Sequence, residues 1–100
     1  MSYIPTPAAL SLLRANLGYF DSEIPPALEQ YLMSLLSVAE EKLRTDCHLN
    51  LDPESLYDTD LIVMYAAWRY RKAVTGEDKP RMLTSAIRNR QTGQALEAST

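Results

Sequence analysis

The sequence contains few of the residues from which catalytic, metal and disulfide sites are built. Its 100 residues include one cysteine and one histidine, at the adjacent positions Cys47 and His48. One cysteine excludes an intrachain disulfide framework, and two ligands are too few for a structural zinc site, which needs four. Adjacent side chains usually diverge, so this pair is not expected to act as nucleophile and base. We predict no enzyme, no catalytic residue, no metal and no cofactor.

Long apolar runs are also missing. The longest, residues 61–68, is well short of the roughly 18 consecutive apolar residues that a membrane span needs. The first seven residues show no basic stretch followed by an apolar one, which a secretion signal would require. We therefore expect a soluble chain that neither crosses a membrane nor is secreted.

Glycine is scarce, with only Gly18, Gly76 and Gly93, whereas the helix formers leucine, alanine, glutamate and arginine are plentiful. This composition favours helices throughout. The sequence predicts an all-α fold, a small bundle of about four helices with a long central helix. We expect one domain over residues 1–91 and a flexible tail over residues 92–100, which are small and polar.

Start and stop signals mark the first two helices. Thr6 is a suitable N-cap with Pro7 at the first helical position, and Gly18 is suited to end that helix in the left-handed conformation. A second helix begins at Pro25-Pro26, and its apolar residues recur at helical spacing as far as Leu43. Such spacing is typical of a helix with one buried face.

The third and fourth helices are separated by the segment 76–80. The third is expected to run to about Thr75, and its residues 61–68 leave no polar face. A helix that is apolar on every side must be surrounded, by the other helices or by another subunit. Pro80 leads a short fourth helix, which we predict to end near Gln91.

The longest internal loop spans residues 46–57 and leads into an acidic run. This run lacks the central glycine and the terminal glutamate of a calcium loop. We predict instead that Asp58 or Thr59 caps the third helix, where free N–H groups favour negative charge, and that Asp60 has the same role. The acidic residues of the run are Asp52, Glu54, Asp58 and Asp60.

Charge is distributed unevenly along the chain, although the formal net charge is only −3. Residues 1–68 carry three basic and ten acidic side chains, whereas residues 69–90 carry seven basic and two acidic ones. A molecule with one acidic and one basic face is suited either to nucleic acid or to copies of itself packed head to tail. Composition does not choose between them.

The basic stretch has Trp68 and Tyr70 interleaved with its charges. It is suited to DNA binding, to pairing with acidic residues of the second helix or of a neighbour, or simply to solvation. The pI of about 5.0 opposes tight nonspecific DNA binding. Tyr65 and Trp68 are expected to be core or interface anchors. The candidate interface residues are Arg69, Arg71, Lys72, Arg81, Arg88 and Arg90.

Four features, in order over residues 6–91, suggest a family. They are a short opening helix with Ala8-Ala9-Leu10-Ser11-Leu12-Leu13-Arg14 and an acidic turn at Asp21, a long second helix with Ala39-Glu40, a third helix Asp60-Leu61-Ile62-Val63-Met64-Tyr65-Ala66-Ala67-Trp68-Arg69-Tyr70-Arg71, and Pro80-Arg81-Met82-Leu83 before a final helix with Arg88-Asn89-Arg90. In this order and total length the chain resembles the phage head-tail connector family, the small helical adaptors beneath the portal of long-tailed phages. Family members often have a glycine-containing turn after the second helix, where this chain has the longer insertion 46–57.

The resemblance implies a structural protein without catalytic activity. Its copies would form a ring beneath the portal protein, dock a tail-completion protein, and let DNA pass through the channel without binding it specifically. The protein would lie in the neck of the virion after assembly in the host cytoplasm. The arginines of the basic stretch would then contact neighbouring subunits or the portal. The alternative function is a small helical DNA-binding regulator that uses residues 69–90.

Overall fold

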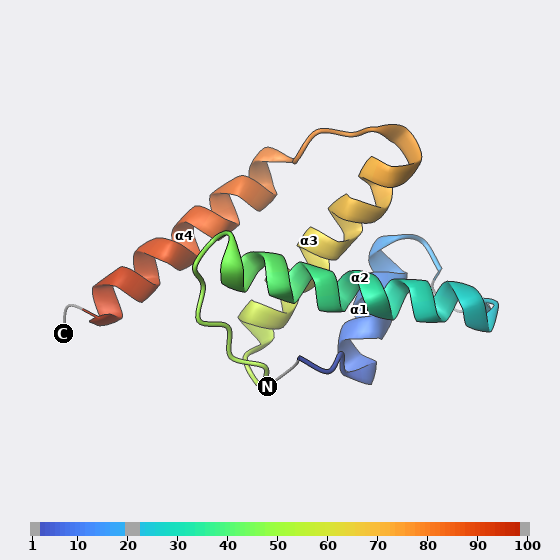
Figure 1. The fold of residues 1–100 in the computed structure, drawn as a ribbon, viewed down its shortest axis with the longest axis horizontal. Coiled ribbons are helices and arrows are strands. Elements are labelled where there is room, and N and C mark those ends of the chain that lie inside the picture. The colour runs from blue at the N-terminus through green and yellow to red at the C-terminus, as the bar shows by residue number, and fades with distance from the viewer. Residues whose placement is uncertain (1–2, 20–22, 99–100) are drawn as a thin grey trace.

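The computed structural model describes residues 3–19 and 23–98, and the regular structure in these ranges is entirely α-helical. Four helices follow one another along the chain (Figure 1). This confirms the predicted all-α bundle. The helices are α1 (Pro7–Asn16), α2 (Pro26–Thr45), α3 (Leu56–Thr75) and α4 (Arg81–Ala98).

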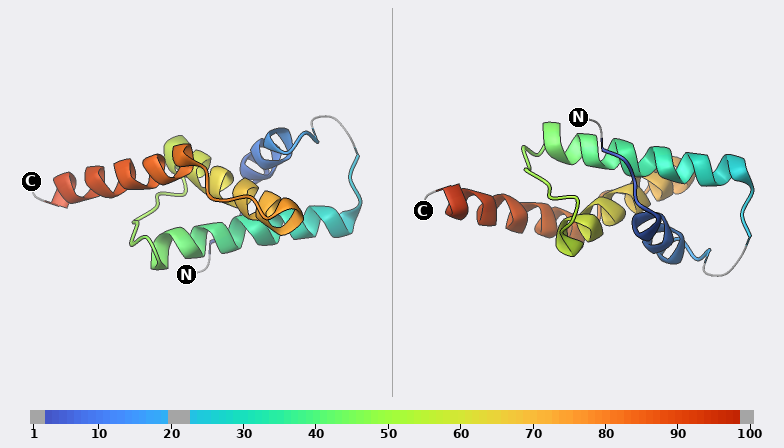
Figure 2. Two further views of the ribbon diagram at one scale, coloured as in Figure 1. Left: turned by 90° about the horizontal axis from the view of Figure 1, so that it is seen from above. Right: turned by 90° about the horizontal axis from the view of Figure 1, so that it is seen from below.

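Helix α3 forms the centre of the molecule. It contacts each of the other three helices, and every residue from 61 to 68 except the half-buried Met64 is buried. In both views of Figure 2, α1 and α2 lie on different sides of α3, and the C-terminal half of α4 projects beyond the rest of the bundle. The prediction that the apolar half of this helix must be surrounded is confirmed.

The ends of α1 follow the sequence signals. The N–H of Ala9 donates to Thr6 Oγ1 at 3.1 Å, which satisfies one of the free amides of the first turn, and Pro7 occupies the first helical position. After Asn16 the chain leaves the helix through Gly18, whose φ is +90°. The acidic turn expected at Asp21 lies outside the described residues.

The predicted start of α3 is wrong. The helix begins at Leu56 with Ser55 as its N-cap, and Ser55 Oγ accepts from the N–H of Asp58 at 3.3 Å. Because the serine hydroxyl does the capping, the buried Asp58 carboxylate accepts instead from the N–H of Asp52 at 2.8 Å. Asp60 is exposed and lies beyond the first turn, so it is not a cap either.

The predicted end of α4 is also wrong, because the helix continues past Gln91 to Ala98. The expected flexible tail is therefore helical over residues 92–98, and residues 99 and 100 lie outside the described ranges. Two glutamine side chains tie this part of α4 to the loop after α2. Gln91 Nε2 donates to the carbonyl of Cys47 at 2.9 Å, and Gln94 Nε2 donates to that of His48 at 2.8 Å. Gln94 Oε1 accepts from the N–H of Asn50 at 2.6 Å.

A buried ion pair joins α4 to the beginning of α3. Arg90 Nε lies 2.8 Å from Asp58 Oδ1, and Arg90 Nη2 also donates to the carbonyl of Asn50 at 2.7 Å. The Arg90 and Asp58 side chains are 16% and 4% exposed, and the hydrogen bond to Asp58 raises the pKa of the guanidinium. Since Leu83 and Ile87 are the buried apolar residues of α4, polar contacts supply much of its attachment.

Gly93 provides a test of the helical C-terminal segment. A Cβ at this position would meet no atom within 4 Å, so we expect Gly93→Ala to raise the free energy of unfolding by up to about 1 kcal/mol. Gly76→Ala is the matched control, because Gly76 has a φ of +74° and alanine there should lower the same quantity by about 1 kcal/mol. Urea denaturation followed by circular dichroism measures both. An unchanged midpoint for Gly93→Ala would mean that residues 92–98 are not helical in solution.

Arg90→Ala tests the ion pair. Removal of the guanidinium leaves Asp58 buried without its cation, and we expect the free energy of unfolding to fall by about 3 kcal/mol. Arg88→Ala, an exposed arginine two positions earlier on the same helix, should change it by less than about 0.5 kcal/mol. If the two substitutions changed the free energy of unfolding equally in the same urea titration, the ion pair would not contribute to the stability of the fold.

Candidate interaction surface

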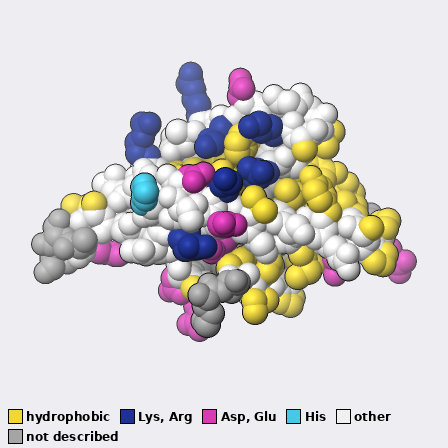
Figure 3. Space-filling model, viewed as in Figure 1, with side chains coloured by type: hydrophobic (Ala, Val, Ile, Leu, Met, Phe, Trp, Pro, Cys, Tyr) yellow, Lys and Arg dark blue, Asp and Glu magenta, His cyan; other side chains and the backbone are white. Residues whose placement is uncertain are grey.

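Lysine and arginine side chains gather on one part of the molecule. In Figure 3 most of them lie over the second half of α3, the 76–80 loop and the first half of α4, whereas most visible aspartates and glutamates lie at the opposite edge or at the two ends. We define the cationic surface by its five members on these elements. They are Arg69, Lys72, Lys79, Arg81 and Arg88.

An aromatic pair lies beneath these charges. Trp68 and Tyr65 are 8% and 6% exposed, and their rings meet edge to face with centroids 5.4 Å apart. The ammonium groups of Lys72 and Lys79 each lie 5.0 Å from the centre of the Trp68 ring, within the range of cation–π attraction. The indole N–H donates to the carbonyl of Glu77 at 3.2 Å and so fixes the loop. Of the two predicted roles, core or interface anchor, the structure assigns the core to both aromatics.

Two other residues of the basic stretch hold α1 in place. Arg71 Nη2 donates to the backbone carbonyl of Asn16 at 2.9 Å and to its side-chain oxygen at 2.8 Å. It thereby satisfies a carbonyl in the last turn of α1, which has no partner within the helix. The Tyr70 hydroxyl shares a hydrogen bond of 2.8 Å with that of Tyr19, and this bond raises the pKa of Tyr70. Both side chains thus have intramolecular roles that sequence reasoning missed.

The candidate interface residues therefore fall into two groups. Arg71 and Arg90 contact other parts of the chain, as described above. The other four candidates belong to the cationic surface, to which the structure adds Lys79, and none of these five residues forms an ion pair with a described carboxylate. The expected pairing with the acidic residues of α2 does not occur among the described residues. Glu40 pairs with Arg44 of the same helix at 3.0 Å, and Asp46, the C-cap of α2, lies 3.7 Å from Lys42.

The adjacent Cys47 and His48 lie in the loop after α2. His48 is exposed and adopts a positive φ of 56°, which turns the chain. Burial raises the pKa of the half-buried Cys47 thiol, Lys79 partly offsets this, and Asp46 adds to the increase. An activated nucleophile needs the opposite shift. Within residues 3–19 and 23–98, no group of three or more histidine, cysteine or acidic side chains is arranged to hold a metal ion.

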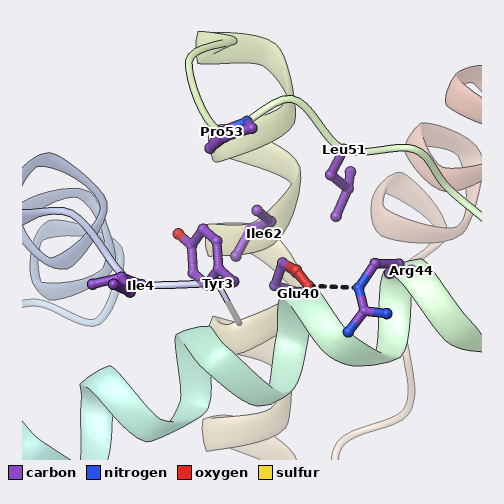
Figure 4. A pocket seen from close by; sticks show the side chains of 7 residues that line it. All are labelled: Tyr3, Ile4, Glu40, Arg44, Leu51, Pro53 and Ile62. Atoms are coloured by element: carbon purple, nitrogen blue, oxygen red, sulfur yellow. Dashed lines mark hydrogen bonds and ion pairs between the residues drawn. The ribbon is translucent and has the colours of Figure 1, made fainter. Parts of the chain in front are cut away.

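A separate apolar pocket of about 390 Å³ lies where the N-terminal segment crosses α2 and α3. Figure 4 shows Tyr3 and Ile62 facing the Glu40–Arg44 ion pair across it. Burial above all, and then the negative charge of Glu40, raises the pKa of Tyr3. No residue pattern predicted this pocket, because its walls come from four distant segments. The residues that line it are Tyr3, Ile4, Glu40, Arg44, Leu51, Pro53 and Ile62.

Comparisons with known proteins do not identify a family. No protein-family model, no curated protein and no solved structure matches the chain. None of the helices in the described residues is long and apolar enough to cross a bilayer. The resemblance to head-tail connectors thus stays a prediction from the sequence.

Thiol reactivity tests the conclusion on Cys47. We expect the native protein to react with the disulfide reagent DTNB at least about tenfold more slowly than the urea-unfolded chain, because the thiolate is the reactive form. Lys79→Ala should slow the native reaction further, since the ammonium stabilises the thiolate. His48→Ala should leave the rate unchanged. A native rate above the unfolded one, lost in His48→Ala, would instead indicate a Cys-His pair.

Proposed function

We propose that this protein is a head-tail connector subunit, a structural protein without catalytic activity whose copies form a ring beneath a phage portal and extend the DNA channel. The observation that carries the proposal is the cationic surface, which has no carboxylate partner among the described residues. The helix order supports it, since a short α1 precedes two helices of 20 residues and a final helix. The partners would be copies of the chain, the portal protein and a tail-completion protein, in the virion neck.

Charges of opposite sign at another edge of the molecule favour self-assembly. Asp52, Glu54 and Asp60 are exposed around the beginning of α3, whereas Arg69 and Lys72 of the cationic surface lie in its second half. Two different and complementary surfaces on one subunit make heterologous contacts, which close into a ring when the rotation between subunits permits. The cationic surface would then be covered by neighbours or by the portal.

A channel for DNA also has to avoid binding it. The formal net charge of −3 gives a ring of many copies a large negative charge once the cations face neighbouring subunits. Such charge repels DNA over a Debye length of about 8 Å at physiological ionic strength. Passage of DNA without specific binding is therefore compatible with the charge of this chain.

A small helical DNA-binding regulator is the second candidate function. One observation favours it, because Arg81 and Arg88 are exposed on α4, an 18-residue helix that follows a loop. A helix of this kind can enter the major groove and donate hydrogen bonds from arginine to bases and phosphates. The acidic net charge opposes this function, since nonspecific DNA affinity depends on neutralised phosphates.

Assembly with a portal tests the proposed function. We expect the protein to sediment with the portal protein encoded in the same phage or prophage genome, and electron microscopy to show a ring attached to the portal. The Arg69→Glu/Arg81→Glu variant should lose this attachment while its melting temperature changes by less than about 3 °C, because neither side chain has a described ion-pair partner. Glu29→Lys, a reversal on the exposed first turn of α2, should attach normally.

A different pair of results would support the DNA-binding regulator instead. Failure to sediment with the portal, together with retardation of a DNA fragment that weakens steeply as salt rises, would replace the connector with the regulator. In that case Arg88→Ala should weaken the retardation.

A further inference from the structure

A small cationic pocket lies between α4 and the loops that flank it. Its volume is about 150 Å³, and both of its charged residues, Lys79 and Arg88, belong to the cationic surface. Cys47 and Ile87 supply apolar walls, and Thr84 and Gln91 complete the lining. Neither cation forms an ion pair with a described carboxylate, and the nearby Asp46 lies 3.7 Å from Lys42 instead.

The chemistry of the pocket is suited to a carboxylate. Two cations of one chain at the same depression repel each other unless an anion lies between them. The Gln91 amide donates to the carbonyl of Cys47 at 2.9 Å, which fixes one wall. An acidic side chain would receive charge-assisted hydrogen bonds from the guanidinium and the ammonium group, the strongest class that side chains form.

The beginning of α3 presents a carboxylate, Asp60, that could pair with the cations of this pocket. Asp60 is exposed and forms no ion pair among the described residues. Leu56 and Tyr57, four and three positions earlier on the same helix face, are 82% and 57% exposed. A carboxylate flanked by exposed apolar side chains is typical of a surface that another molecule covers.

We propose that the cationic pocket binds Asp60 of a second copy of this chain, with Leu56 and Tyr57 covered at the same contact. Charge complementarity selects the second copy, since one chain carries both an unpaired cationic pocket and an unpaired carboxylate beside exposed apolar residues, and no ion pair joins the two in the monomer. The inference rests on the proposed function and names the subunit contact within it. The same pairing made reciprocally would give a two-fold dimer, and made head to tail would give a ring.

A charge-swap experiment tests the contact. Light scattering of the full chain at about 50 mM salt, over a concentration series, should show self-association that weakens at high salt. Arg88→Glu and Asp60→Lys should each weaken association by about tenfold or more, because each places like charges together. The double variant Arg88→Glu/Asp60→Lys should restore it to within about threefold, as expected for a directly coupled pair.

Controls separate the contact from folding and from general charge. Glu29→Lys makes the same charge reversal as Asp60→Lys at an exposed site on α2 and should associate like the original protein. Circular dichroism should show unchanged helix content in every variant, because neither Arg88 nor Asp60 has a described ion-pair partner.

Each contrary result has one meaning. A chain that stays monomeric at every concentration, or a double variant that does not recover, overturns the proposed contact. If the monomer retards DNA and Arg88→Glu does not, the occupant of the pocket is a nucleic-acid phosphate. Rings on the portal that persist in Arg88→Glu overturn the contact and leave the connector standing. A two-fold dimer that follows the charge-swap pattern supports the contact and contradicts the ring.

Discussion

Residues 61–68 of α3 are apolar on every side, so this part of the helix has to be covered on every side. The rest of the molecule is arranged around it. Burial of all of its residues 61–68 except the half-buried Met64 removes from water most of the longest apolar run of the sequence, and the free energy gained scales with the apolar area buried. Helices α1, α2 and α4 each pack against α3 and together cover it. Most charged side chains lie at the rim of this arrangement, and the buried carboxylates Glu40 and Asp58 are each paired with an arginine.

The polar contacts then decide how α4 is attached. Its buried apolar residues, Leu83 and Ile87, lie in its first half, so apolar packing alone does not fix the second half. Arg90 reaches Asp58 at the beginning of α3, and Gln94 reaches the loop after α2. A desolvated ion pair adds little net stability but tolerates few other geometries. It therefore acts mainly to select one position of the helix.

Local signals explain which parts of this fold could be predicted. Apolar spacing within one helix and the Thr6 and Gly18 signals act over a few residues, and they led to the correct fold class and to the correct start of α1. The start of α3 was missed because Ser55, Asp58 and Thr59 are all suitable capping residues. The contact of Asp58 with Arg90, 32 positions away, is not visible in a local pattern. The helical segment 92–98 depends on contacts of Gln94 with a loop 44 to 46 positions away, and no local pattern encodes these.

The sequence predicted which segment of the chain is basic, but not which of its basic residues are exposed. Counting charges identified the basic stretch, yet the distinction between Arg90, which is nearly buried, and the exposed Arg88 depends on the rotation of α4 about its axis. The rotation of α4 also gives Gln91 two roles. Its side chain donates to the carbonyl of Cys47, and it lines the cationic pocket. An anion bound in that pocket would contact α4 and the loop together, and by linkage it would stabilise the docked position of α4. If the proposed contact forms, attachment of α4 and occupation of the pocket would favour each other, because both use the same position of Gln91.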